Sequence, residues 1–384
     1  MPALGDLKIL EFGGIGPGPF CGMLLADMGA EVLRLDRFEA AGFGVDIPPQ
    51  FDLMNRNKHS LAIDLKKAEG RELALDLIAG ADALIEGFRP GAMERLGLGP
   101  EQCQARNARL VYARLTGWGQ DGPLAKVAGH DLNYIALTGA LHAIGPDDRV
   151  PPPPLSLLGD YAGGGLNAAF GIMCALHEAR RSGMGQVVDV AMMDGVATLM
   201  TSFIGWRQLG FWTAERGANI SDGGAHFYGC YETSDGRYVA VAAVEDKFYR
   251  RLLELIGLGE ADLPDQHDRS HWPAMRSRLE AVFRTRTLDE WRALLEGSEA
   301  CFAPVLDMDE ARAHPHNSAR CVFVTSAGVW QPAPSPRLSR TPGEVRKAPG
   351  EDLQSPEIIF ARWGVREETV AIAGRAGVFA PGTI

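Results

Sequence analysis

The fold of this chain is decided by residues 8–37, KILEFGGIGPGPFCGMLLADMGAEVLRLDR. Residues 8–12 have the apolar pattern of a short buried strand, and residues 31–35 repeat it. Between them, residues 13–19 have the pattern of a tight glycine-rich loop and residues 20–29 that of a helix. A strand, a helix and a second strand in this order predict two parallel strands with the helix packed on one face of the sheet.

The glycine-rich loop is similar to a dinucleotide-binding fingerprint but does not complete it. The third glycine is missing in both possible frames, where Pro19 and Cys21 stand instead. Pro17 and Pro19 also lack the amide protons that would bind a pyrophosphate. The loop therefore favours a tight strand-to-helix turn over a nicotinamide or flavin site.

The same alternation continues toward the C-terminus. Strand patterns at residues 61–65, 83–86 and 110–115 are separated by helical patterns, including a long one at residues 68–79. Strands that alternate with helices predict an α/β fold in which a mostly parallel sheet carries helices on both faces. Ligands of such sheets bind at the carboxyl ends of the strands, so the residues that directly follow each strand matter most.

Several of those residues are basic. Arg37 follows the second strand, Lys66 the third and Arg89 the fourth, with Arg95 shortly after. Together they would form a local cationic patch for an anionic ligand. Solvated surface side chains are the simpler alternative, because arginine and lysine are mostly exposed in globular proteins.

Length and charge restrict the class of protein. A single core stops growing at roughly 250 to 300 residues, so the 384 residues predict two domains. The net charge of −11 disfavours nucleic acid and anionic membranes as partners, since both need a dense cationic surface. The six scattered cysteines have no metal-binding or redox spacing. Without a signal peptide or an apolar run near the roughly 20 residues of a membrane helix, we expect a cytoplasmic protein with no metal site.

The residue composition and the pattern of predicted elements change after residue 190. A polar glycine-rich stretch at residues 217–224 precedes a hairpin pattern around Ser234-Asp235-Gly236. Helical patterns and a short strand follow, which together predict a small α/β domain. The predicted division is a large domain at residues 1–190 that is completed by residues 335–384, a linker at 191–228, the small domain at 229–319 and a return linker at 320–334.

Two segments carry residues suited to acid–base chemistry, GHDLNY at residues 129–134 and GDYAGGG at residues 159–165. His130 follows a glycine at an expected helix start, where the helix dipole favours the neutral imidazole that a general base needs. Asp160 is expected to open a second helix beside three glycines, either as a plain N-cap or as an acid near main-chain donors. Glu245 opens a helix of the small domain, as a first-turn helix acid or as a group that orients an imidazole.

The residue patterns by themselves name no substrate. The sequence lacks the Gly-x-Ser-x-Gly elbow, the His-Glu-x-x-His zinc helix and the phosphate loop, which removes the commonest hydrolase, zinc-peptidase and nucleotide-triphosphatase interpretations. What remains is an acid and a base placed around one small centre.

Longer runs of the sequence resemble the class III coenzyme A transferases. The resemblance covers nearly the whole chain and keeps the motifs in order, which makes it specific. The matching runs are GGIGPGP at 13–19, MGAEVLRLDR at 28–37, IEGFRPG at 85–91, TGWGQDGP at 116–123, GHDLNY at 129–134, GDYAGGG at 159–165 and DGRYVAV at 235–241.

The resemblance implies a large Rossmann-like domain built from both chain ends, a small domain, and a homodimer whose two subunits interlock. Active sites in such dimers lie between the large domain of one subunit and the small domain of the other. Coenzyme A arrives as part of an acyl thioester substrate, so no separate cofactor is implied. A loose apolar acyl pocket is expected near Ile15, Pro17 and the methionines of residues 192–200.

Within the family, the residue before the aspartate of the Gly-x-Asp motif separates two activities. The racemases carry Gly-His-Asp, as here with His130, whereas many transferases have an aromatic or other residue there. Transferases also often have four glycines in the small domain, where this chain has only Gly223-Gly224. The resemblance therefore implies an isomerase of lipid and fatty acid metabolism that interconverts (R)- and (S)-2-methylacyl-CoA by 1,1-proton transfer through an enolate.

The same resemblance assigns roles to individual residues. His130 and Asp160 would be the opposed acid and base, and Glu245 would lie near His130 from the second subunit. An alternative activity is transfer of coenzyme A between carboxylates through a mixed anhydride of Asp160. A non-catalytic acyl-CoA-binding protein would require His130 or Asp160 to face away from the pocket. Coenzyme A would be held by Arg37, Ile63, Asp64, Leu65, Lys66, Gly87, Phe88, Arg89, Arg95, Gly129, Asp131, Leu132, Asn133 and Tyr134.

Overall fold

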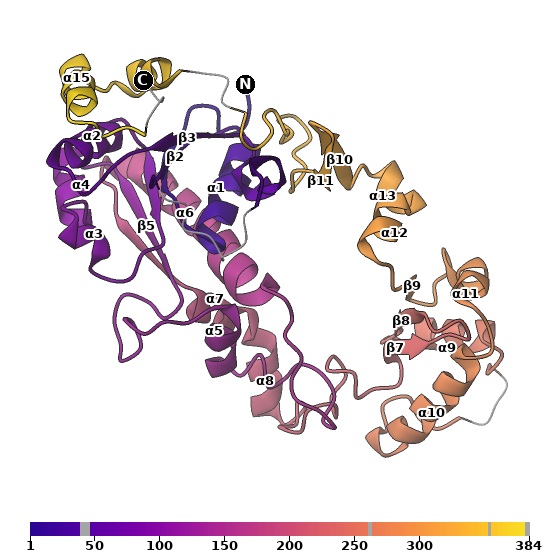
Figure 1. Ribbon diagram of the computed structural model, residues 1–384. Helices are drawn as coiled ribbons and strands as arrows, with labels where there is room; N and C mark the ends of the chain where they lie inside the picture. The colour runs from indigo at the N-terminus through magenta and orange to yellow at the C-terminus, as the bar shows by residue number, and fades with distance from the viewer. Residues whose placement is uncertain (39–46, 260–262, 352–354, 381–384) are drawn as a thin grey trace. The chain divides into compact units, whose positions relative to one another are not determined.

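The computed structural model of the chain (Figure 1) describes residues 1–38, 47–259, 263–351 and 355–380. The chain folds into two compact units, each assembled from separate stretches of sequence. The first unit contains residues 1–138, 154–199 and 320–384, and the second contains residues 139–153 and 200–319.

A six-stranded sheet forms the centre of the first unit. All neighbouring strands are parallel, and their order is β3-β2-β1-β4-β5-β6. This topology confirms the predicted α/β fold with a parallel sheet. The strands are β1 (Lys8–Phe12), β2 (Glu31–Asp36), β3 (Lys58–Ala62), β4 (Ala83–Glu86), β5 (Val111–Thr116) and β6 (Val187–Ala191).

The side chains of each strand alternate between the two faces of the sheet, as the twofold period of a strand requires. In β1, Leu10 and Phe12 join one core while Ile9 joins the other. The first face is covered by α2 (Ala68–Ala79) and α4 (Pro100–Arg106), and the second by α1 (Pro17–Asp27) and α6 (Asn167–Ser182) (Figure 1). Because both faces are buried, the central strands are almost continuously apolar.

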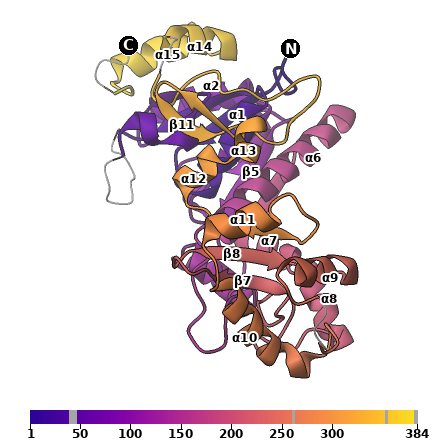
Figure 2. The same ribbon diagram turned by 90° about the vertical axis from the view of Figure 1, so that its right-hand side faces the viewer.

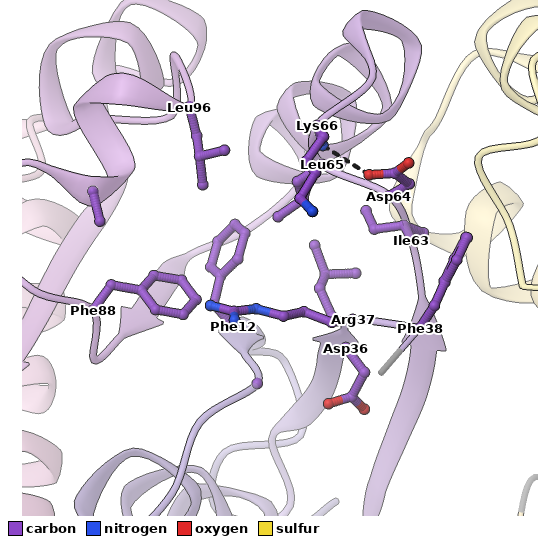
Figure 3. A pocket seen from close by; sticks show the side chains of 13 residues that line it. Phe12, Asp36, Arg37, Phe38, Ile63, Asp64, Leu65, Lys66, Phe88 and Leu96 are labelled. Carbon is purple, nitrogen blue, oxygen red and sulfur yellow. Dashed lines mark hydrogen bonds between the residues drawn. The ribbon is translucent and has the colours of Figure 1, made fainter. Parts of the chain in front are cut away.

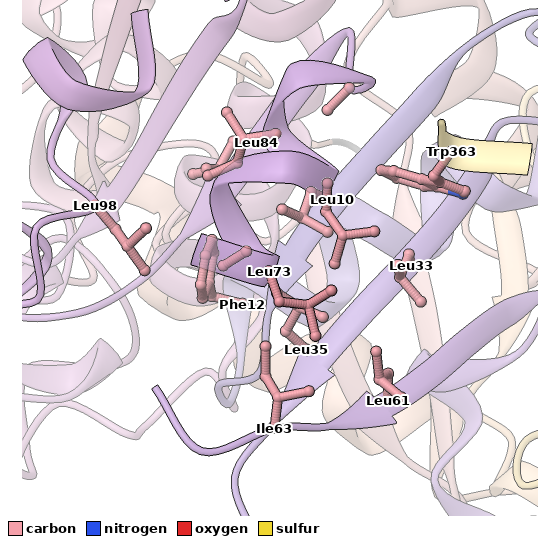
Figure 4. Packing of buried hydrophobic residues seen from close by; sticks show 14 of the residues in the cluster. Leu10, Phe12, Leu33, Leu35, Leu61, Ile63, Leu73, Leu84, Leu98 and Trp363 are labelled. Atoms are coloured by element: carbon pink, nitrogen blue, oxygen red, sulfur yellow. The ribbon is translucent and has the colours of Figure 1, made fainter. Parts of the chain in front are cut away.

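The C-terminal helices pack on the first of these two cores. Helix α14 (Pro356–Trp363) buries Ile359, Phe360 and Trp363 against it, and α15 (Glu367–Arg375) packs on α2. Figure 4 shows Trp363 together with leucines of the neighbouring strands. The Trp363 indole also donates a hydrogen bond to the Glu31 carboxylate on β2 at 3.0 Å, so its one polar atom is satisfied.

Short helices and one hairpin complete the first unit. They are η1 (Pro49–Phe51), η2 (Leu53–Asn55), α3 (Ala92–Arg95), α5 (Asp131–Leu137), the π-helical segment η3 (Leu157–Leu166), α7 (Met192–Leu199) and the antiparallel hairpin of β10 (Phe323–Ser326) and β11 (Val329–Pro332). Segment η3 packs against both α1 and α7. In the described parts of the chain, no helix is both long and apolar enough to cross a membrane.

The second unit is built on the antiparallel sheet β7-β8-β9, which confirms the predicted hairpin. Figure 2 shows α9 and α10 beside β7 and β8. Its core includes stacked rings of Tyr231 and Phe283, whose centroids are 5.2 Å apart, and Trp291 packs on Phe283 at 5.0 Å. The elements are α8 (Thr201–Leu209), β7 (Tyr228–Glu232), β8 (Tyr238–Ala242), α9 (Asp246–Leu255), η4 (Arg269–His271), α10 (Trp272–Phe283), α11 (Leu288–Leu295), β9 (Phe302–Pro304), α12 (Met308–Ala313) and α13 (Pro315–Ala319).

Candidate active site

Two adjoining cavities lie at the carboxyl ends of β1 and β4 in the first unit. These strands are neighbours at which the strand order reverses, so the loops that follow them separate and leave space between them. The larger space, about 570 Å³, contains Arg37 and Lys66 and is called the basic cavity here. The other, about 430 Å³, contains His130 and Asp160 and is called the central cavity. Phe12, Gly13, Arg37 and Phe88 line both, so one ligand can extend from one to the other.

The basic cavity combines cationic and aromatic side chains. Figure 3 shows the Arg37 side chain extending toward Phe88, and its guanidinium carbon lies 5.3 Å from the centre of that ring. At the other side of the cavity, the Lys66 amide donates to Asp64 Oδ1 at 2.9 Å, which fixes the turn after β3. Neither Arg37 nor Lys66 forms an ion pair with a residue that the structure describes. Such a cavity suits an anionic ligand with a flat ring system.

His130 reaches the central cavity from the start of helix α5. It is the N-cap of that helix, and the Asn133 side chain accepts a hydrogen bond from the His130 amide at 3.1 Å. The predicted helix start at His130 is confirmed. The imidazole is exposed on the first unit, where a ligand in the central cavity can reach it.

Asp160 reaches the same cavity from a less common kind of helix. The prediction that Asp160 caps a helix is wrong, because the π-helical segment η3 begins before it and Asp160 lies in its first turn. The three glycines that follow it are buried. A methyl group on Gly163 would come within 2.8 Å of the Met192 carbonyl oxygen on α7, and one on Gly165 within 2.8 Å of the Pro17 carbonyl oxygen on α1. The glycines therefore allow η3 to pack closely against both helices.

The glycine-rich turn after β1 allows a close approach to the Asp160 carboxylate. Gly16 has a φ of +70°, a conformation that other residues rarely adopt. A side-chain carbon added there would lie 2.9 Å from Asp160 Oδ2. The turn that is similar to a dinucleotide fingerprint is thus occupied, in this chain, by a carboxylate from η3.

The ionisation of Asp160 is strongly influenced by its surroundings. Partial burial and, to a smaller extent, the nearby Asp131 carboxylate raise the pKa of the Asp160 carboxyl to about 6, while His130 opposes the rise. A carboxyl with such a pKa exchanges protons readily near neutrality, which suits general acid and base catalysis. Both features expected of an acid–base pair, a shared cavity and a tuned carboxyl, are therefore present.

The segment before His130 is held by Tyr134. Its ring is buried against Gly117 and Gly129, where an added side-chain carbon would overlap ring atoms. Its hydroxyl donates a hydrogen bond to the Gly129 carbonyl oxygen, one residue before His130. Trp118 packs edge-on against the same ring at 4.8 Å. These contacts fix the main chain that carries the imidazole.

A sequence profile of CoA-transferase family III matches residues 4–352. The chain belongs to this family. A mouse protein named alpha-methylacyl-CoA racemase is 43% identical over 370 residues, covering 96% of this chain and 95% of the mouse protein. A human protein of the same name is 44% identical over 341 residues, covering 88% and 87%. The crystal structure of a CAIB/BAIF family protein from Brucella suis has a TM-score of 0.80 at 26% identity, covering 94% of this chain and 99% of that one.

The coenzyme A positions implied by the family resemblance divide into three groups. Arg37, Ile63, Asp64, Leu65, Lys66 and Phe88 line the basic cavity, and Gly87, Phe88, Arg89, Gly129 and Tyr134 line the central one. Four others line neither cavity. Arg95 and Leu132 are exposed, Asn133 caps the His130 amide, and Asp131 is buried beneath the site. The first two groups form a continuous surface from the cationic end to His130.

Glu245 lies in the second unit, outside both cavities. It is the N-cap of helix α9, with an extended backbone conformation. The family role of this residue, near His130 from the other subunit, stays a prediction.

Part of the apolar lining of the central cavity lies where the sequence predicts it, and part lies at the end of β5. The expected Ile15, Pro17 and Met192 do line the central cavity. Leu115 and Trp118 line it too, because they lie at the carboxyl end of β5 and directly after it. The rule that ligands bind after strands could have found them, since it applies to apolar residues as well as to basic ones.

Proposed function

We propose that this chain is a racemase that interconverts the (R)- and (S)-epimers of 2-methylacyl-CoA thioesters. The observation that carries the proposal is that His130 and Asp160 line one cavity, with the pKa of the carboxyl raised to about 6. The family membership and the name shared by the mouse and human relatives support the substrate class.

The reaction follows from the placement of two groups that each hold or release one proton. The thioester makes its α-proton acidic because the enolate carries charge on oxygen. His130 removes that proton from one epimer, and Asp160 delivers a proton to the opposite face; in the reverse direction the roles exchange. Two groups are required, because one base would return the proton to the face that it left. The enolate oxygen needs fixed hydrogen-bond donors, and main-chain amides of the glycine-rich segment that follows Asp160 would supply them.

The rest of the thioester would occupy the basic cavity. Arg37 and Lys66 would bind the phosphates, and the rings of Phe12 and Phe88 would contact the flat adenine. Arg95, Asp131, Leu132 and Asn133 belong to the proposal only through the family resemblance. Coenzyme A is part of the substrate, so the mechanism needs no further cofactor or metal.

An interlocked homodimer is part of the same proposal. Leu166, Phe170 and Leu209 are large apolar side chains that are 56%, 69% and 79% exposed in the isolated chain, and a second copy would bury such surfaces. In the dimer, Glu245 of the partner subunit would hydrogen-bond near His130. Sedimentation of the protein as one 41.4 kDa chain at micromolar concentration would contradict the dimer. We place the enzyme in the cytoplasm and in lipid and fatty acid metabolism.

Transfer of coenzyme A between carboxylates is the second candidate. It is favoured by one observation: the Asp160 carboxylate faces the cavity and accepts no hydrogen bond from a described residue, so it is free to attack an acyl carbon. His130 argues for the racemase, because anhydride formation needs no base in its position. The non-catalytic alternative requires one of the two residues to face away, but both line the cavity.

One incubation separates the two activities. A single epimer of a 2-methylacyl-CoA is incubated with the enzyme in deuterium oxide, with and without an added free carboxylate. Deuterium at the α-carbon with a mixed epimer pool and no new thioester is the expected result. An untouched α-proton together with coenzyme A on the added acid would establish the transferase instead.

A further inference from the structure

Asp131 is a buried carboxylate without a cation. The residue is only 5% exposed, and no arginine, lysine or histidine among the described residues forms an ion pair with it. Oδ2 accepts a hydrogen bond from the Asp160 amide at 2.7 Å. Oδ1 is buried and has no hydrogen-bond partner in the described part of the chain. An isolated buried charge is costly, so its presence calls for a reason other than stability.

The position of Asp131 links the two groups of the proposed acid–base pair. It follows His130 directly, in the first turn of α5, and its carboxylate binds the main chain of η3 at Asp160. The approach is close, since a side-chain carbon added to Gly159 would lie 2.6 Å from Asp131 Oδ2. The glycine at residue 159 therefore permits this contact, and α5 is held against η3 by it.

Asp131 is also the principal charge that faces Asp160. Among described groups, Asp131 and His130 act on the ionisation of Asp160, and Tyr134 and Tyr161 respond to its charge. The elements packed around η3 carry other charged side chains, but these have other partners or lie near helix ends. Asp27 on α1 pairs with Arg56, and Arg114 on β5 pairs with Glu86 and Glu94. Asp189 on β6 accepts from the Gln120 amide with Asp194 of α7 nearby, and the last turns of α6 carry His177, Glu178, Arg180 and Arg181.

We propose that Asp131 is a positioning residue of the active site, whose carboxylate holds the Asp160 main chain against α5 and places a negative charge beside the Asp160 carboxyl. The inference rests on the proposed racemase function, in which Asp160 must be able to donate a proton. Asp131 touches neither cavity, so it acts through Asp160 and not on the thioester.

Replacement of Asp131 by asparagine separates the charge from the hydrogen bond. In Asp131→Asn the amide oxygen can still accept from the Asp160 amide, while the negative charge is lost. The titration of Asp160 is followed by carbon-13 NMR of labelled carboxyl groups, with its resonance assigned by its absence in Asp160→Asn. We expect the midpoint to fall from about 6 toward the ordinary carboxyl range, by about one pH unit or more, because one repulsive neighbour is removed.

The pH dependence of kcat/KM should shift in the same direction as the Asp160 titration. With the 2-methylacyl-CoA epimer whose α-proton Asp160 removes, the acid limb of the kcat/KM profile should shift to lower pH in Asp131→Asn, while KM stays close to the wild-type value. Asp82→Asn is the matched control, because Asp82 Oδ2 also accepts a main-chain amide, from Lys8 at 2.9 Å, at the amino end of the sheet. This control should leave both the Asp160 titration and the profile unchanged.

Several results would overturn the proposal. An unchanged Asp160 titration in folded Asp131→Asn would do so, as would a raised KM with an unshifted acid limb, which indicates direct contact with coenzyme A. If the asparagine variant does not fold, Asp131→Ser, which removes the charge with a smaller side chain, takes its place in the same titration. The NMR measurement uses no substrate, so a wild-type enzyme that fails to racemise refutes the proposed function while the titration still tests the role of Asp131.

Discussion

Two sets of buried or half-buried carboxylates in the first unit differ in whether a cation lies beside them. Glu11 and Glu86 follow the pattern of structural charges: Lys58 Nζ lies 2.7 Å from Glu11 Oε2, and Arg114 Nε lies 2.8 Å from Glu86 Oε1. Asp131 and Asp160 have no lysine or arginine partner among the residues that the structure describes, and each instead faces the other carboxylate. Both sets border the same glycine turn, since Lys58 also donates to the Pro19 carbonyl oxygen at 2.9 Å.

The difference separates charges that hold the fold from charges that react. Burial raises the pKa of Glu11, and the Lys58 ammonium opposes that rise, so the pair remains a fixed part of the interior. At Asp160 burial and Asp131 both raise the pKa, and only His130 opposes them. A carboxylate left without a cation is easy to protonate, which is a cost for stability and an advantage for proton transfer.

The largest effect is expected from removing either member of the acid–base pair. His130→Ala and Asp160→Ala should each lower racemisation by about 10³-fold or more, because general acid and base groups contribute on this scale. Each variant keeps one base, so α-proton exchange should survive for the epimer that presents its proton to that base. The measurement is deuterium incorporation into each epimer separately. Equal loss of exchange from both epimers would contradict the placement of the two groups on opposite faces.

The second prediction tests the buried ion pair of Glu11 and Lys58. Lys58→Met should lower the free energy of unfolding by about 3 to 5 kcal/mol, because it leaves Glu11 buried without its cation. The double variant Glu11→Leu with Lys58→Met should recover much of that loss. Urea denaturation measures both, with the exposed Lys126→Met as control. A double variant as unstable as the single one would show that ion pairing is not what Lys58 contributes.

The smallest effect has the opposite sign. Asp160→Asn should stabilise the protein at pH 7.5, because ionising a carboxyl whose pKa is raised in the folded state costs free energy that the unfolded chain does not lose. After allowance for solvent at this half-buried site, the gain is about 1 kcal/mol. The penalty is fully present above pH 6 and fades toward the ordinary carboxyl pKa near 4. A gain that is as large at pH 4.5 as at pH 7.5 would refute this origin.

The sequence predicted the sheet well because the signals are local. Apolar strands that alternate with helices dictate parallel pairing, and β1, β2, β4 and β5 appear where the pattern places them. The helix start at His130 was equally local, since one glycine and a polar helix pattern define it. The third strand was displaced, at Lys58–Ala62 and not at residues 61–65, because its buried lysine disguises the apolar pattern.

The site was only partly predictable because its decisive contacts join distant residues. Nothing near Asp160 in sequence indicates a π-helix, which forms where η3 packs between α1 and α7. Nor does the glycine turn reveal that Gly16 makes room for Asp160, 144 positions later by the numbering of the chain. Such contacts depend on which elements the fold brings together.

By itself the sequence determined the parallel sheet, the positions of His130 and Asp160 and the family, because these depend on local periodicity and on ordered motifs. Only the tertiary structure decided which carboxylates meet a cation and which do not. Packing decides this: Lys58 on β3 reaches Glu11 on β1, whereas α5 and η3 bring Asp131 to Asp160, where His130 is the one basic group among the described residues that acts on the Asp160 carboxyl. Whether a buried carboxylate meets a cation depends on residues that are distant in sequence, and the fold decides which of those residues lie beside it.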